Sequence, residues 1–187
     1  RTLIQPSSLA LARVSVLRGE GPREGEPFID DHIWTTEPIV DYLTQFSGIQ
    51  PDDLDPKRTQ RTLVSHKTAY KKLRMLTDLG CRFIGHGLAK DFRIINIFVP
   101  PSQVIDTVQL YHSPAHPRNL SLRFLSWFLL KKDIQQGLAL GVEQHDGHDS
   151  IEDALAALQL FRKYEQFERD GRLEDMLEDL YEIGPRV

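Results

Sequence analysis

The order of its apolar segments constrains the fold of this chain more than any other feature. Two strand-like runs come first, Leu9 to Leu17 and Phe28 to Ile33, and the glycine-rich turn between them predicts a hairpin. Helix-like and strand-like segments then alternate up to a final helix. A hairpin followed by alternating strands and helices predicts an α/β fold, in which a mixed sheet is flanked by helices.

The later elements are predicted from periodicity and from the positions of glycine and proline. They are, in order, a short helix in "TEPIVDYLTQFSGI" that ends at Gly48, a loop over "QPDDLDP", a helix from Lys67 to Leu79, a buried strand in "CRFIGHG", a helix from Leu88 to Ile97, a strand in "QVIDTVQLY", a helix in "LSLRFLSWFLL" and a final helix from Ser150. At 187 residues the chain has the length of one domain. We therefore expect a single domain over residues 1–187, with an acidic helix and tail from about residue 165.

Apolar runs and cysteine usage indicate the surroundings of the chain. No apolar run approaches the ~18 residues of a membrane span, so we expect a soluble protein with no membrane partner. Cys81 is the only cysteine and cannot form an internal disulfide, which is typical of a reducing compartment and predicts a cytoplasmic location. We expect Cys81 to pack as a small apolar residue, and a metal site built on thiolates is excluded.

Charge is unevenly distributed along the chain, although the net charge is only −4. The segment from Lys57 to Arg74 contains seven Lys or Arg and no acid. This segment is either a surface that faces phosphate groups or the solvated face of a helix, and the two interpretations are about equally favoured. Acidic residues predominate from Glu165 to Glu182, which predicts a solvated helix and tail.

The stretch "HDGHDSIEDALAAL" places a histidine, His148, five residues before Asp153. One interpretation is structural: Ser150-x-x-Asp153 fits a capping box, with Asp149 or Ser150 as the cap, and the apolar steps of three and four that follow predict a helix packed on a core. The other interpretation is catalytic, with His148 as a base and Asp153 as a metal ligand. The motif alone favours the structural interpretation.

A second carboxylate, Asp91, lies in "FIGHGLAKDF", where a predicted strand runs through His86 into a helix. Strand ends and helix starts are where α/β folds gather sites, although Asp91 would also stabilise the positive end of its own helix. Carboxylates that converge repel one another and favour a hard divalent cation. Two such ions activate water and stabilise the leaving oxygen in phosphoryl chemistry, while a nearby histidine takes the proton.

Both motifs are similar to those of a known family. "GHGLAKD" resembles the second motif, and "HDSIED" the third, of the DEDD exonucleases of the ribonuclease H-like fold, and the position of His148 resembles the DEDDh subgroup. A longer series that includes "LARVSVLRG", "GEPFIDDHI", "VIDTVQLYH" and "HDSIEDALAALQLFRKY" resembles the nuclease domains of the catalytic subunits of the Pan poly(A)-specific deadenylases. This second resemblance covers almost the whole chain.

The resemblance implies a metal-dependent 3′-5′ exoribonuclease that shortens the poly(A) tails of messenger RNA and releases AMP. It implies two divalent metal ions, Mg²⁺ or Mn²⁺, bound by acidic residues that include Asp91 and Asp153. It also implies that His148 is the general base, so that His148, Asp91 and Asp153 form the catalytic set. The implied partners are poly(A) RNA, a regulatory pseudokinase subunit and poly(A)-binding protein.

The chain departs from the family's pattern in one respect. The first motif, an Asp-x-Glu on a central strand upstream of "LARVSV", is absent, while Asp30 and Asp31 lie on a later strand and are not assigned its role. We therefore expect residues upstream of Arg1, and a central first strand whose absence would leave unpaired sheet edges. Two rival functions stay open: a catalytically silent module that binds RNA or protein, and a DEDDh exonuclease that acts on other RNA or DNA ends.

Other residues are weighed against the site. Asp106, in "VIDTV", is expected to hydrogen-bond a neighbouring loop rather than bind metal. His86 fits a structural role and an RNA contact about equally. Aromatic residues would offer stacking faces for adenines, but in apolar helix patterns they more often belong to the core. We therefore place four of them outside the site: Trp34, Trp127, Phe124 and Phe128.

Overall fold

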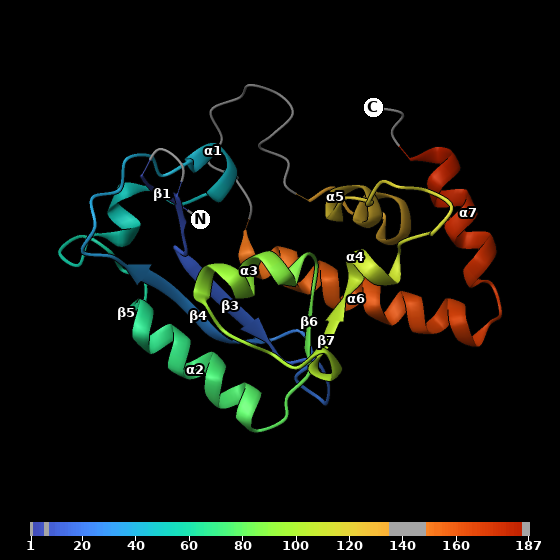
Figure 1. Ribbon diagram of the computed structural model, residues 1–187, viewed down its shortest axis with the longest axis horizontal. Coiled ribbons are helices and arrows are strands. Elements are labelled where there is room, and N and C mark those ends of the chain that lie inside the picture. The colour runs from blue at the N-terminus through green and yellow to red at the C-terminus, as the bar shows by residue number, and fades with distance from the viewer. Residues whose placement is uncertain (1, 6–7, 135–148, 185–187) are drawn as a thin grey trace.

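The computed structural model describes residues 2–5, 8–134 and 149–184; four strands come first, helices and strands then alternate as far as β7, and helices follow (Figure 1). The strands are β1 (Thr2–Gln5), β2 (Ser8–Ala10), β3 (Arg13–Leu17), β4 (Pro27–Trp34), β5 (Leu63–Ser65), β6 (Phe83–Gly85) and β7 (Val104–Asp106). The α-helices are α1 (Thr44–Ser47), α2 (His66–Asp78), α3 (Leu88–Ile95), α4 (Thr107–Leu110), α5 (Leu122–Leu125), α6 (Ser150–Arg169) and α7 (Leu173–Ile183). Two short 3₁₀ helices, η1 (Pro51–Leu54) and η2 (Pro101–Gln103), and one π-helical segment, η3 (Ser126–Leu130), complete the set.

The predicted hairpin is confirmed. β3 and β4 pair antiparallel, with Ser15 opposite Asp30, and β5 then adds parallel to the other edge of β4. The predicted strand from Leu9 to Leu17 proves to be two strands, because β2 pairs with β1 whereas β3 pairs with β4. A single apolar run therefore serves two different sheets.

The sheet is interrupted between β3 and β6. Along the described ranges, β3 pairs only with β4, and β6 pairs only with β7, so each of these two strands has one edge without a neighbour. Helix α6 contacts both β3 and β6, and the side chains of one apolar cluster join the two blocks.

Helices α2 and α6 lie on opposite faces of the β3–β5 sheet. Successive side chains of a strand point to opposite faces. On β4, the carboxylate of Asp31 accepts a hydrogen bond from Lys72 of α2. The carboxylate of the preceding Asp30 binds Arg13, which also contacts Asp149 at the start of α6. The chain is thus layered as helix, sheet and helix.

The predicted apolar face of α2 is confirmed. Ala69 and Leu73 are buried against Ile33 of β4, and Leu76 packs on the same cluster. A larger cluster forms where α6 meets α5, η3 and α7. Residues at its centre are at most 1% exposed, which makes this region the most deeply buried part of the described chain: Tyr111, Leu125, Leu160 and Leu180.

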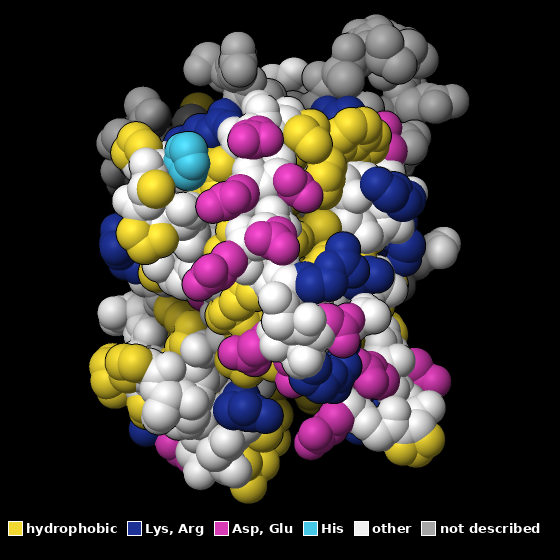
Figure 2. All heavy atoms as spheres, turned by 90° about the vertical axis from the view of Figure 1, so that its right-hand side faces the viewer, with side chains coloured by type: hydrophobic (Ala, Val, Ile, Leu, Met, Phe, Trp, Pro, Cys, Tyr) yellow, Lys and Arg dark blue, Asp and Glu magenta, His cyan; other side chains and the backbone are white. Residues whose placement is uncertain are grey.

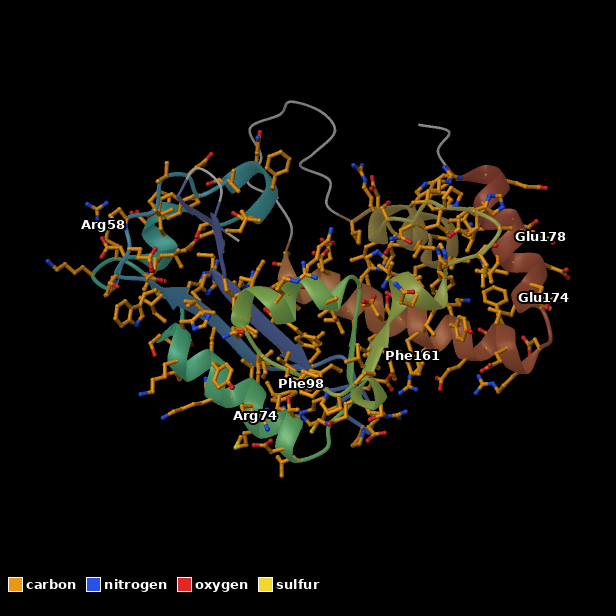
Figure 3. All side chains as sticks on the ribbon, viewed as in Figure 1. Arg58, Arg74, Phe98, Phe161, Glu174 and Glu178 are labelled. Carbon is orange, nitrogen blue, oxygen red and sulfur yellow. The ribbon has the colours of Figure 1, made fainter. Side chains whose placement is uncertain are left out.

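The C-terminal segment differs from its prediction. Helix α6 continues to Arg169, the chain turns at Gly171, and α7 follows instead of a solvated tail. Met176, Leu180 and Tyr181 of α7 are buried, because apolar residues at steps of three and four pack it against α6. Its acidic side chains cover only the outer face, where Glu174 and Glu178 point away from the core (Figures 2 and 3).

Three smaller predictions are also corrected. The strand predicted over "QVIDTVQLY" ends at Asp106, because the Asp106 carboxylate caps α4 by accepting the amide of Val108. The predicted loop at "QPDDLDP" contains η1, which is closed by a capping box between Gln50 and Asp53. Cys81 is exposed instead of packed. No helix in the described part of the chain is both long and apolar enough to cross a bilayer.

Candidate active site

The junction between β6 and α3 places Asp91. The strand ends at Gly85, Gly87 adopts a left-handed conformation with φ 77° as the N-cap, and Asp91 falls in the first helical turn, as predicted. A left-handed residue is accommodated by glycine without steric cost. The positive end of α3 therefore supports the charge of Asp91, which is half-buried.

Asp106 of the neighbouring strand β7 holds this junction in place. Its Oδ1 accepts the amide of Gly87 at 2.8 Å, and its Oδ2 accepts the amide of Leu88 at 3.0 Å. The same carboxylate also caps α4. The prediction that Asp106 hydrogen-bonds a neighbouring loop is confirmed.

His86 belongs to this junction and lies in the sequence between Gly85 of β6 and the N-cap Gly87. Its Nδ1 is 2.9 Å from Oγ1 of Thr107, a buried hydroxyl that donates to the carbonyl of Gly85. Burial lowers the pKa of His86, while the charge of Asp106, a backbone hydrogen bond at Leu120 and the charge of Asp153 offset part of that shift. His86 therefore has a structural role in this fold, and Asp153 lies within its electrostatic reach.

The lowered pKa of His86 predicts a pH-dependent stability. Because the unfolded histidine titrates near its ordinary value of 6.5, the unfolded chain takes up this proton first as the pH falls. The stabilisation from neutral His86 is complete above about pH 6.5 and is lost as the pH falls through the folded-state pKa. We expect the stability advantage of the parent over His86→Asn, measured by urea unfolding, to shrink between about pH 7.5 and about pH 5.5.

A control substitution at Gln60, an exposed residue that does not titrate, separates this effect from general acid sensitivity. The offset between the parent and Gln60→Asn should stay constant over the same range. A constant offset for His86→Asn as well would contradict the burial of a neutral imidazole.

Gly85 is required by the close approach of Leu88. A Cβ atom at Gly85 would lie 2.5 Å from Cδ2 and 2.7 Å from Cγ of Leu88, closer than van der Waals contact allows. Gly85→Ala should therefore destabilise the fold by about 1–3 kcal/mol, the usual effect of overpacking, in urea unfolding experiments. The matched control is Gly19→Ala, where the nearest atom would lie 4.0 Å away. Equal stability of the two variants would show that Leu88 moves aside freely.

The start of α6 places Asp153. Asp149 is the N-cap, and its Oδ1 accepts the amides of Ile151 at 2.8 Å and Glu152 at 3.2 Å. Of the two caps that the sequence allowed, Asp149 is therefore the one used. The capping box of Ser150 with Asp153 is wrong, because the hydroxyl of Ser150 binds the hydroxyl of Ser15 on β3 instead. His148, the predicted base, lies outside the described residues.

The structure thus brings Asp91 and Asp153 to the first turns of two helices beside the same strand. Asp91 follows β6 directly, and α6 packs against β6. Among residues 2–5, 8–134 and 149–184, no group of three or more His, Cys, Asp and Glu side chains is arranged to hold a metal ion. Two carboxylates nevertheless fit Mg²⁺, which takes one or two protein carboxylates and completes its shell with water and substrate phosphate.

The carboxylates of Asp30 and Asp31 bind other side chains of the protein. This agrees with the decision not to assign them the role of the first motif. Asp30 accepts from Arg13 at 2.8 and 3.1 Å and from Ser15 at 2.8 Å. Asp31 is buried and bound to Lys72. Sequence reasoning missed Arg13, although an arginine inside an otherwise apolar strand indicates a buried ionic partner.

The basic segment and the aromatic residues occupy different surroundings. Four of the seven cations from Lys57 to Arg74 form ion pairs with acids of the same chain, which favours a solvated surface over a phosphate site: Arg58, Arg61, Lys72 and Arg74.

The aromatic residues were expected in the core, and only part of that expectation holds. Phe124 and Phe128 pack on the large cluster, whereas Trp34 and Trp127 are exposed.

Comparison with known proteins identifies similar nucleases. Residues 3–161 match the exonuclease family RNase_T. The curated catalytic subunit PAN2 of the PAN2-PAN3 deadenylation complex of Chaetomium globosum is 59% identical over 184 residues, which is 98% of this chain and 16% of that protein. The corresponding subunit of Schizosaccharomyces pombe is 53% identical over 186 residues, 100% of this chain and 16% of that protein. The chain spans about a sixth of the length of these relatives.

Solved structures show the same fold. The Pan2 catalytic unit of Neurospora crassa, with its protease and nuclease domain, superposes with a TM-score of 0.89 at 56% identity, over 97% of this chain and 28% of that one. The Saccharomyces cerevisiae Pan2 pseudoubiquitin hydrolase-RNA exonuclease module in complex with A7 RNA gives 0.82 at 44% identity, over 96% and 28%. The prediction of a ribonuclease H-like mixed sheet flanked by helices is confirmed.

Proposed function

This chain belongs to the exonuclease family, and from that premise we propose that it shortens the poly(A) tails of messenger RNA from the 3′ end and releases AMP. The observation that carries the proposal is the placement of Asp91 and Asp153 on the first turns of α3, which follows β6, and of α6, which packs against β6. The choice of substrate is supported by the relatives, whose names describe deadenylation, and by the solved relative with bound A7 RNA.

The proposed chemistry assigns a role to each of these residues. Asp91 and Asp153 would hold two divalent cations, Mg²⁺ or Mn²⁺, since hard cations prefer carboxylate oxygen. When bound, these ions supply a water of lowered pKa and positive charge for the leaving oxygen. His148 takes the proton from the attacking water, and the positive ends of α3 and α6 support the negative charge of the phosphate.

Asp106 and His86 keep the geometry of the site through contacts within the protein. Asp106 fixes the two amides that lead into α3, and therefore the direction of the helix that carries Asp91. His86 contacts the hydroxyl of Thr107, which in turn donates a hydrogen bond to the carbonyl of Gly85 at the end of β6. A site held by such contacts loses little entropy on binding substrate, which is how orientation contributes to rate.

The proposed partners follow from the same relatives. The PAN2-PAN3 names support a second subunit, which we propose to be a regulatory pseudokinase, and poly(A) as the substrate suggests contact with poly(A)-binding protein. We place the protein in the cytoplasm, a reducing compartment, because its single cysteine is exposed and has no disulfide partner within the chain.

The test uses the natural gene product that carries this chain. It is incubated with RNAs of mixed sequence that end in a poly(A) tail and carry a 5′ label, with the same RNAs without the tail, and with single-stranded DNA, each in Mg²⁺ or in chelator. We expect a ladder that shortens by one nucleotide at a time, with AMP as product, only on tailed RNA and only in Mg²⁺. Equal cleavage of all three substrates would replace the poly(A) proposal by a general exonuclease. Binding of RNA without cleavage would make the chain a silent module.

A further inference from the structure

A cluster of polar side chains ties the start of α6 to the β3–β4 hairpin. Arg13 of β3 holds Asp30 of β4 through two parallel hydrogen bonds, Nε to Oδ1 at 2.8 Å and Nη2 to Oδ2 at 3.1 Å. The remaining Nη1 lies 3.6 Å from Oδ2 of Asp149. Beside it, Ser15 donates to Asp30 at 2.8 Å and meets the hydroxyl of Ser150. Segments more than 130 residues apart are joined here.

The carboxylate of Asp149 has two separate uses. Its Oδ1 caps α6 by accepting two backbone amides, and its Oδ2 faces Arg13. The guanidinium is planar, and its two bonds to Asp30 fix its orientation. A cap that is also held by a fixed guanidinium determines where the first turn of the helix begins relative to the sheet.

We propose that Arg13 is a positioning residue for the reaction: through Asp149 it sets the first turn of α6, and with it Asp153, against the β3–β4 hairpin. This inference rests on the proposed function of Asp153.

The charges of the cluster support a permanent ionic contact. Burial would raise the pKa of Asp30, but the hydrogen bonds from Arg13 and Ser15 outweigh it and lower the pKa instead. Burial acts to lower the pKa of Arg13, and its contacts with Asp30 and Asp149 raise it above its ordinary value. Arg13 thus stays charged between two carboxylates, which would repel each other without it.

The ion pair between Arg13 and Asp149 is expected to affect catalysis more than the stability of the fold. The side chain of Asp149 is 53% exposed and its contact with Arg13 is long, so this ion pair contributes little to the stability of the fold. The remainder of α6 is held independently, since Arg162 binds Glu24 and the carbonyl of Gly19 in the hairpin turn. Loss of the contact therefore frees one turn of the helix and leaves the packing of the rest intact.

Asp149→Asn is the most informative variant. Asparagine caps a helix as well as aspartate does, so the substitution keeps the cap and removes only the charge that faces Arg13. Arg13→Gln removes the other partner, and the double variant tests whether the two act as one unit. Arg162→Gln is the matched control, because it breaks the second attachment of α6 at a distance from Asp153.

We expect kcat on poly(A) to fall about 3–5-fold in each single variant, with KM within a factor of ~2, and the double variant to be no slower than the slower single variant. Mn²⁺ affinity, titrated without RNA, should weaken about 3-fold, and the amides of Ile151 and Glu152 should exchange faster with solvent. Arg162→Gln should leave kcat within a factor of ~2 of the parent.

Two results would overturn the proposal. One is a kcat for Asp149→Asn and Arg13→Gln within a factor of ~2 of the parent, and the other is a multiplicative loss in the double variant, which would mean that the residues act separately. If the parent cleaves no RNA, the proposed function fails by itself. The positioning role is then decided by Mn²⁺ affinity and amide exchange, and unchanged exchange in both single variants rejects it.

Discussion

Asp91→Asn and Asp153→Asn are each expected to lower the rate of RNA hydrolysis by on the order of 10³-fold. Asparagine keeps the size of the side chain but removes the charge that a divalent cation requires. Metal ions supply several kcal/mol of transition-state stabilisation, and each ~1.4 kcal/mol corresponds to a factor of ten in rate. Metal affinity should fall together with the rate.

Single-turnover hydrolysis of poly(A) at limiting Mg²⁺ measures this loss most sensitively. Glu174→Gln is the matched control, since it removes one negative charge from the outer face of α7, where Figure 3 shows the side chain pointing to solvent. Its rate should equal that of the parent. Undiminished hydrolysis by Asp91→Asn under these conditions would remove Asp91 from the metal site.

His148→Ala is expected to reduce turnover on poly(A) by roughly 10²–10⁴-fold at saturating Mg²⁺, the usual contribution of a positioned base. The melting temperature and the affinity for metal should stay close to those of the parent, because the cap of α6 is Asp149 and not its neighbour. The loss should therefore appear in kcat alone.

The capping and catalytic interpretations of this motif are separated by a second variant. Asp149→Ala removes the cap and should cost ~0.5–2 kcal/mol of stability, measured by urea unfolding. If His148→Ala hydrolyses poly(A) within a factor of a few of the parent, the histidine is no base, and the motif serves only to start the helix. A large loss of stability in His148→Ala would instead assign it a structural role.

Local patterns predicted the elements that depend on local interactions. Helix α2 keeps the apolar spacing of Ala69 and Leu73 that identified it, and its capping hydroxyl is supplied by the residue just before it. Helix α3 starts where Gly87 permits a left-handed cap, and this places Asp91 in its first turn. The hairpin follows from two apolar strands joined by a glycine-rich turn.

The predictions that failed depend on contacts between distant segments. Ser150 looked like a cap from its neighbours in the sequence, but Ser15 of β3 lies close enough to bind its hydroxyl. The acidic residues of α7 led to the prediction of a solvated helix and tail. Its regularly spaced apolar residues, which include Met176 and Leu180, instead form a buried face. The contact of Arg13 with Asp149 cannot be predicted from either segment alone, because each residue has an ordinary use within its own element.

We propose that Asp91 and Asp153 share the metal ions that the reaction uses. The most direct measurement is a crystal structure of the natural gene product that carries this chain, grown with Mn²⁺, with the metal located by its anomalous scattering. We expect an anomalous peak between α3 and α6, with carboxylate oxygens of both Asp91 and Asp153 at about 2.0–2.3 Å. A fully occupied Mn²⁺ that touches neither carboxylate, in a protein that hydrolyses poly(A) in the same buffer, would contradict it.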